Sequence, residues 1–157
     1  MKLKNVEQLN LTIAQILNQS EQSKAKFKYA LLRNADYLEP EAKRLQKMLE
    51  EYAEVLKPFE EKRVELVKKY GKANEDGSIK VEEGTSEMEQ FQKEMEELKE
   101  EHKEAFEAYD AKIKEFNETV LEEDVDVKVY NFSADLMPDN LTTRQIAVLT
   151  LNGLIAE

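Results

Sequence analysis

Apolar residues recur at helical spacing near both ends of this chain. The first stripe consists of Val6, Leu9, Ile13, Ile16 and Leu17. It predicts a helix that Asn5 caps and that ends near Asn18. A last apolar face follows Thr142, which can form a capping box with Gln145. We expect this C-terminal helix to pack against the N-terminal one.

Two series of residues recur every seven positions in the central part of the chain. The first contains Leu38, Leu45, Tyr52, Phe59 and Leu66, and the second contains Met88, Met95, His102, Tyr109 and Phe116. Heptad spacing predicts two helices that pack along a shared seam in antiparallel orientation. Because proline cannot donate a backbone hydrogen bond, Pro40 predicts a break near Glu39, and Pro58 predicts a kink or break near Lys57.

The stretch that joins the two heptad segments reads KANEDGSIKVEE, from Lys72 to Glu83. Its spacing resembles a helix–loop–helix calcium loop, but Lys72 and Lys80 occupy positions where such a loop needs oxygen ligands. The Asp76-Gly77 pair instead favours a two-residue turn of a β-hairpin. His102, the single histidine, is interpreted as a polar seam residue that fixes register rather than as a catalytic or zinc-binding group.

These patterns together predict a mainly α-helical protein. We expect a long antiparallel, coiled-coil-like helical hairpin with a small β-hairpin at its tip. Alternation of Val125, Val127 and Val129 with polar residues predicts a short strand, which packs with the terminal helices at the base. The predicted organisation is one elongated domain, 1–157, comprising N-terminal helices (1–38), the hairpin (41–121, tip 72–83) and a strand plus helix (125–157).

The composition argues against an enzyme. The chain has no cysteine and one histidine, which removes disulfides, thiolate nucleophiles and Cys-based metal sites. The four glycines form no phosphate-binding motif, and carboxylates are too abundant for one pair to stand out as acid and base. We therefore predict no catalytic residues, no cofactor and no metal site. No apolar run approaches a membrane span, and no signal segment is recognised, so a cytoplasmic location is expected.

Charge is distributed unevenly along the chain, whose net charge is −11. Residues 82–124 contain 17 acidic side chains against five lysines, whereas the first 35 residues contain six Lys or Arg against Glu7 and Glu21. This polarity can hold the two ends of one molecule together, pair one copy with another, or attract a basic partner.

One set of glutamates is predicted to point away from the second seam. It consists of Glu96, Glu97, Glu100, Glu104 and Glu107. Four of them form a row spaced roughly 5 Å apart along a helix, against about 3.4 Å per phosphate on a DNA strand. The row is either a partner-binding surface that imitates nucleic acid or a solvated face of a coiled coil. Direct nucleic-acid binding is disfavoured, except through the basic first 35 residues.

The order of elements resembles an uncharacterised family of small tailed-phage and prophage proteins. Four stretches carry the resemblance: MKLKNVEQLNLTIAQIL, KFKYALLRNADYLEPEAKRL, FEEKRVELVKKYGKANEDGSIKV and LTTRQIAVLTLNGLI. The most specific piece runs from Glu60 to Val81. The resemblance implies a viral origin and no reaction, because the family carries no catalytic residues to transfer.

The function expected from the sequence is non-enzymatic binding of a host or phage protein, with homo-oligomerisation through the helical seams. In the infected bacterial cell such an accessory protein can inhibit host defence. Two alternatives remain open at this point. One is a structural or assembly role in the virion, and the other is an oligomeric sponge for a nucleotide signal.

Overall fold

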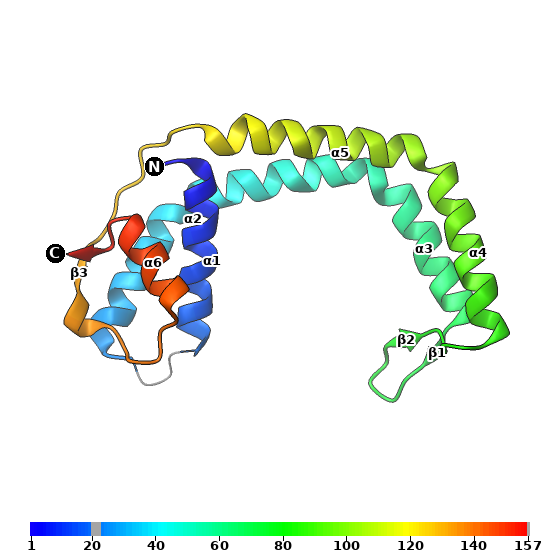
Figure 1. The fold of residues 1–157 in the computed structure, drawn as a ribbon, viewed down its shortest axis with the longest axis horizontal. Helices are drawn as coiled ribbons and strands as arrows, with labels where there is room; N and C mark the ends of the chain where they lie inside the picture. The colour runs from blue at the N-terminus through cyan, green and yellow to red at the C-terminus, as the bar shows by residue number, and fades with distance from the viewer. Residues whose placement is uncertain (20–22, 157) are drawn as a thin grey trace. The chain divides into compact units, whose positions relative to one another are not determined.

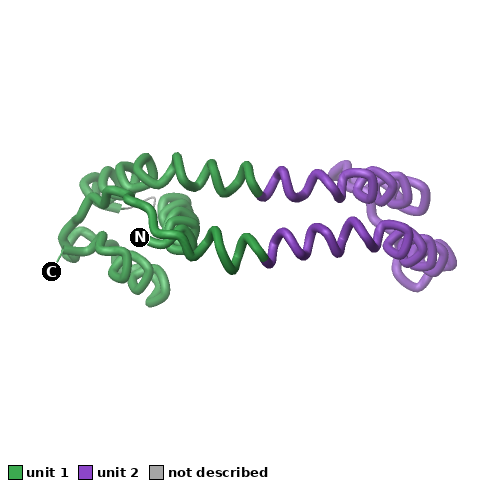
Figure 2. The backbone as a smooth tube through the Cα atoms, turned by 90° about the horizontal axis from the view of Figure 1, so that it is seen from above, with its two compact units in different colours: residues 1–48, 115–157 green, residues 49–114 purple. Residues whose placement is uncertain are grey.

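The computed structural model describes residues 1–19 and 23–156, which form a mainly helical protein with a small two-stranded antiparallel sheet. The chain divides into two compact units, which Figure 2 distinguishes by colour. Unit 1 comprises residues 1–48 and 115–157, and unit 2 comprises residues 49–114. These boundaries differ from those of the predicted three-part domain.

Unit 1 is built on α1 (Leu3–Gln19), the first part of α2 (Ala25–Ala53) and α6 (Thr143–Leu151). The predicted contact between the terminal helices is confirmed, since α6 packs against α1 (Figure 1). The core consists of fully buried apolar side chains from these helices and the C-terminal segment. They include Val6, Leu9, Ile13, Ile16, Phe27, Leu31, Leu38, Leu149 and Leu154.

The two predicted helix caps have different outcomes. Thr142 caps α6, and its capping box with Gln145 is confirmed. The prediction that Asn5 caps the first helix is wrong, because α1 already begins at Leu3. The backbone of Leu3 is held by the carbonyl of Glu123 at 3.0 Å, so a tertiary hydrogen bond sets the start of the helix.

The predicted break near Glu39 is also wrong, since α2 passes through Pro40 without interruption. Proline in a helix interior costs about 3 kcal/mol through the lost hydrogen bond and a steric clash. Here Leu38 and Leu45 are both buried, on either side of Pro40. Burial of these two side chains offsets the local cost, so the boundary predicted at residues 38–41 does not exist.

The segment after α5 (Lys103–Glu118) crosses unit 1 with little regular structure. It includes two short 3-10 turns, η2 (Val120–Glu122) and η3 (Ala134–Leu136). A strand β3 (Phe132–Ser133) pairs in parallel with β4 (Ile155–Ala156). The strand predicted at Val125, Val127 and Val129 is therefore wrong. The valines are half-buried, and the pairing near them is limited to an isolated antiparallel bridge between Lys2 and Asp124 and the backbone hydrogen bonds of Val125 with Met1.

The N-terminus is fastened to the start of this segment. The Met1 amino group donates to the carbonyl of Val125 at 3.0 Å, and the Val125 N–H donates back to the carbonyl of Met1 at 2.8 Å. The ammonium groups of Lys4 and Lys2 pair with Glu122, and these hydrogen bonds lower the pKa of that carboxyl. Two of the N-terminal cations are thus already matched by a carboxylate.

Unit 2 begins within the last turns of α2, and at the end of that helix the effect of proline is as predicted. A 3-10 turn η1 (Glu54–Leu56) separates α2 from α3 (Lys57–Tyr70), which carries Pro58 in its first turn. The second seam lies in α4 (Ser86–Glu101) and α5. All members of both heptad series are buried or half-buried.

Helices α3 and α4 lie side by side in unit 2 (Figure 1). Tyr70 meets Phe91 near one end of the pair, with ring centroids 6.3 Å apart. Farther along, Lys62 reaches Glu101 at 3.4 Å. At the far end, Phe59 packs edge-on against Phe106 at 4.8 Å. From the first of these contacts to the last, the residue numbers fall along α3 and rise along α4 and α5. The two segments therefore run in opposite directions.

A small antiparallel pair, β1 (Lys72–Ala73) and β2 (Ile79–Lys80), connects α3 to α4. The chain reverses through three residues rather than the predicted two. The N–H of Gly77 bonds to the carbonyl of Asn74 at 3.0 Å, and Gly77 adopts φ +81°. This is a type I turn followed by a left-handed residue, which glycine tolerates without strain.

The carboxylate of Asp76, at the centre of this turn, accepts hydrogen bonds from another residue of the turn. Its Oδ1 accepts from the backbone N–H of Ser78 at 2.9 Å and from the Ser78 hydroxyl at 2.6 Å. These hydrogen bonds lower the pKa of Asp76 and keep it ionised. Asp76 therefore closes the turn. This role explains the acidic residue that made the stretch resemble a calcium loop.

His102 interrupts the second helical segment. The α4 helix ends at Glu101 and α5 begins at Lys103, with His102 between them at φ −105° and ψ 16°. Its ring packs edge-on against Phe59 at 5.9 Å, and its Nε2 is buried without a hydrogen-bond partner in the described part of the chain. His102 therefore faces α3, and among the described residues no polar partner of Nε2 fixes the register there.

Candidate functional site

The glutamates predicted to bind a partner are all exposed in unit 2, but they do not share one helix. Glu96, Glu97 and Glu100 belong to α4, whereas Glu104 and Glu107 belong to α5. The break at His102 falls in the middle of the row. The row therefore does not lie on one continuous helix, because it changes helix after Glu100.

Glu97 differs from the other four glutamates. It lies 3.9 Å from Lys93 and lines a groove of about 450 Å³ together with Lys62 and Lys69. Among the residues that the structure describes, no ion pair is found for Glu96, Glu100, Glu104 or Glu107. We refer to these four as the outer glutamates.

The same groove contains a carboxylate with several hydrogen bonds, which sequence reasoning did not single out. Glu94 accepts from Lys69 at 2.8 Å and from the Tyr70 hydroxyl at 2.5 Å. These two donors lower the pKa of Glu94, and the carboxylate in turn raises the pKa of Lys69. The contact links α3 to α4.

We expect Glu94→Gln to lower the melting temperature of the protein slightly at neutral pH. Because the pKa of Glu94 is lowered on folding, its ionised form stabilises the folded chain above the ordinary pKa of glutamate. That contribution is lost as pH falls through the lowered pKa, so the difference between wild type and variant should disappear in acid. Thermal unfolding followed by circular dichroism from pH 7 to pH 3 measures this. Glu96→Gln, at an exposed position, is the matched control and should show no such trend.

A cluster of tyrosines around one arginine stands out on the surface of unit 1. We call Tyr29, Arg33, Tyr37 and Tyr130 the Arg33 cluster. Arg33 donates from Nε to the Tyr37 hydroxyl at 3.0 Å and from Nη1 to the Tyr29 hydroxyl at 3.3 Å. Its guanidinium carbon lies 4.9 Å from the centre of the Tyr130 ring, within cation–π range.

The fourth ring is positioned by a buried asparagine. Asn34 is 2% exposed and holds Tyr130 by two hydrogen bonds, donating to its carbonyl at 2.9 Å and accepting from its N–H at 2.9 Å. Asn34 also donates to the carbonyl of Ala30 at 2.8 Å. The Tyr130 ring therefore reaches Tyr29 and Arg33 from a segment distant in sequence, and the cluster is pre-organised.

The Arg33 cluster combines exposed apolar surface with an unmatched charge. Tyr29 is 55% exposed, and Leu32, three residues later on the helix, is 53% exposed. The two phenols raise the pKa of Arg33, so the guanidinium stays charged. Whereas Arg44 and Arg63 pair with Glu41 and Glu60, Arg33 meets phenols and no carboxylate within the described residues.

Sequence reasoning missed the Arg33 cluster although part of its signal was present. Tyr29, Arg33 and Tyr37 follow one another at four-residue spacing, which places them on one face of a helix. The N-terminal helices predicted over residues 1–38 already covered them. Tyr130 could not be assigned to that face, because its position depends on the hydrogen bonds of Asn34.

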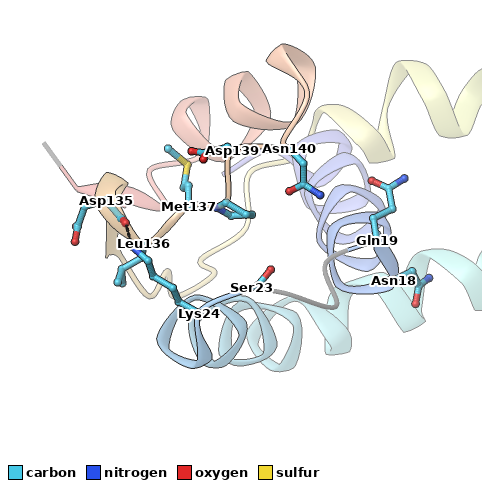
Figure 3. A pocket seen from close by; sticks show the side chains of 10 residues that line it. Asn18, Gln19, Ser23, Lys24, Asp135, Leu136, Met137, Asp139 and Asn140 are labelled. Atoms are coloured by element: carbon cyan, nitrogen blue, oxygen red, sulfur yellow. Dashed lines mark hydrogen bonds between the residues drawn. The ribbon is translucent and has the colours of Figure 1, made fainter.

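A pocket of about 820 Å³ lies elsewhere in unit 1, and Figure 3 shows its lining side chains. It is lined by Asn18, Gln19, Ser23, Lys24 and residues 135–140. The hydroxyl of Ser23 is buried there without a hydrogen-bond partner, and Gln19 accepts from Gln145 at 3.3 Å. The size falls within the range of small-ligand sites.

The charges of this pocket limit what it can hold. Lys24, its single cation among the described lining residues, donates to the backbone carbonyl of Asp135. The carboxyl of Asp135 has a lowered pKa, chiefly because Ser133 donates to it, and Asp139 adds a second carboxylate. Two carboxylates against one engaged lysine oppose the binding of a phosphate group.

Searches for other kinds of site give no further candidate. Within residues 1–19 and 23–156, no group of three or more His, Cys, Asp or Glu side chains is placed to hold a metal ion. No helix in the same ranges combines the length and apolar character needed to span a membrane.

Comparison with protein-family models, with curated proteins and with solved structures finds no match to this chain. The resemblance to a tailed-phage family therefore stays a prediction.

Proposed function

We propose that this chain is a non-enzymatic binding protein whose contact with a protein partner is made through the Arg33 cluster. The supporting observation is the exposed, pre-organised arrangement of tyrosines around an arginine that lacks a carboxylate. Tyrosine and arginine are enriched among the residues that dominate binding energy at protein interfaces. Because Asn34 fixes Tyr130, little conformational entropy is lost on binding.

The same proposal extends to the architecture and origin of the chain. We propose that the two heptad series form an antiparallel, coiled-coil-like hairpin, supported by the opposed contacts of α3 with α4 and α5. We further propose a phage accessory protein that acts in the bacterial cytoplasm, with inhibition of host defence as one form of that role. The sequence resemblance from Glu60 to Val81 supports this origin.

Two alternative functions are weakened by particular features. Imitation of DNA needs a regular row of charges, and the row from Glu97 to Glu107 is divided at His102 and includes the paired Glu97. A sponge for a nucleotide signal needs a cationic pocket, whereas the large pocket of unit 1 carries Asp135 and Asp139. A virion role remains testable by mass spectrometry of purified particles.

Photo-crosslinking tests the proposed interface. Leu32→p-benzoylphenylalanine places a reactive group beside the cluster, and Leu11→p-benzoylphenylalanine places the same group at a similarly exposed leucine of α1 (59% against 53% exposed). On irradiation of the purified protein and of the protein in bacterial lysate, we expect a discrete crosslinked product from position 32 and none from position 11. No product from position 32, or the same products from both positions, would count against the interface.

A further inference from the structure

We propose that the partner of the Arg33 cluster is a second copy of this chain, which presents its outer glutamates, Glu96, Glu100, Glu104 and Glu107, to Arg33 and the tyrosine hydroxyls. This inference rests on the proposed function, because it names the occupant of the same surface. It joins unit 1 of one copy to unit 2 of another.

The first support is that charged groups on both surfaces lack an ion-pair partner within the described residues. Arg33 is a charged guanidinium surrounded by phenols, with no carboxylate partner in the described part of its own chain. The outer glutamates are exposed and have no ion pair within the same ranges. Each surface carries the charge that the other lacks, and both are present on every copy.

The second support is the hydrogen-bonding capacity of the cluster. The Nε and one N–H of Nη1 on Arg33 are used by Tyr37 and Tyr29, which leaves the N–H groups of Nη2 to donate. Both phenol oxygens already accept a hydrogen bond from Arg33, so their O–H groups can donate outward. Convergent donors around a planar cation suit a carboxylate, which accepts through two oxygens.

The third support is that an extended polyanion fits this surface poorly. Nucleic acid is held by several cations along its backbone. Near the N-terminus, Lys2 and Lys4 already pair with Glu122, and Lys24 donates to Asp135. One guanidinium without a carboxylate partner, on a chain of net charge −11, matches individual carboxylates better than a phosphate backbone.

Repulsion between two acidic copies does not prevent such a contact. At physiological ionic strength, charges separated by more than about 8 Å are largely screened, so local pairs outweigh the overall charge. Exposed Tyr29 and Leu32 add apolar area that salt does not weaken. The contact joins two different surfaces, so it can also propagate to assemblies larger than a dimer.

Sedimentation velocity of charge-reversed variants tests the inference. Arg33→Glu disables the cluster, and the double variant Glu96→Lys/Glu100→Lys disables the outer glutamates. The controls are Arg144→Glu, at an exposed position in unit 1, and Glu75→Lys/Glu83→Lys, in the exposed connection between α3 and α4. Each control changes the net charge by the same amount as its test variant.

We expect wild type and both controls to self-associate, and each test variant to associate at least tenfold more weakly. An equimolar mixture of the two test variants should recover an associated species, because one copy contributes an intact cluster and the other an intact row. Arg33→Lys keeps the charge and loses the planar fork, so it should also weaken association, and it guards against misfolding of Arg33→Glu.

A wild type that stays monomeric, a mixture that recovers no complex, or controls that weaken association as much as the test variants would overturn the inference. The crosslink at position 32 separates this failure from failure of the proposed function. A product at twice the chain mass supports self-association. A product of another mass leaves the protein-binding surface intact and contradicts the second copy as its occupant.

Discussion

Phe27→Ala is expected to lower the free energy of unfolding of unit 1 by about 3–5 kcal/mol, the usual cost of deleting a buried phenylalanine ring. Phe27 is fully buried in α2, and its ring packs edge-on against Phe132 at 5.2 Å. The substitution leaves a cavity between α2 and the segment that carries β3. Urea unfolding followed by far-ultraviolet circular dichroism measures the loss, because the chain has no tryptophan.

The control for Phe27→Ala is Leu151→Ala, which removes a large apolar side chain that is 85% exposed in α6. Its expected effect is within about 0.5 kcal/mol, as for other surface substitutions. If Phe27→Ala were no more destabilising than Leu151→Ala, the packing of the β3 segment against α2 would be wrong.

Asn34→Ala is expected to cost about 2–3 kcal/mol, because it leaves the N–H and carbonyl of Tyr130 without their partners. It should also release Tyr130 from Arg33 and so weaken partner binding at the cluster. The first effect is read from urea unfolding. The second is read from the yield of the crosslink at position 32, under conditions in which the variant remains folded.

Asn117→Ala is the matched control for Asn34→Ala, since Asn117 is an exposed asparagine in α5 of the same unit. It should change neither stability nor crosslinking. A variant at Asn34 that lost stability but kept the full crosslink yield would show that the position of Tyr130 is not needed for binding.

Helical periodicity in the sequence predicted most of the fold, because the burial of apolar side chains decides which helical faces pack together. The α1 stripe from Val6 to Ile16 is buried as expected, and α6 packs on α1. Pro58 ends a helix because it stands between two helical segments, where it fits the first turn of α3. Pro40 has the same local chemistry, but the buried Leu38 and Leu45 keep α2 continuous. Local sequence does not reveal that difference.

The positions that sequence reasoning placed wrongly depend on partners distant in the chain. Alternation at Val125 and Val127 predicted a strand, but a strand needs a neighbouring strand, and β4 pairs with Phe132 and Ser133 instead. At the tip, Asp76-Gly77 indicated a turn, whereas the bonds of Asn74 and Ser78 make it one residue longer.

The candidate site likewise contains features that the sequence could reveal and features that it could not. The exposed glutamates of α4 and α5 could be found from the heptad phase, since surface positions follow once a seam is assigned. The interruption at His102 could not be found from the sequence, because neither glycine nor proline marks it. The Arg33 cluster needed Tyr130, whose backbone is held against α2 by the side chain of Asn34.

Hydroxyl-radical footprinting of the wild-type protein at increasing concentration tests most directly whether the Arg33 cluster is an interface. If the cluster is an interface, oxidation of Tyr29 and Leu32 falls as the protein concentration rises, whereas oxidation of the exposed Leu11 and Leu151 stays constant. Constant oxidation of Tyr29 and Leu32 across the range in which association is measured would contradict it.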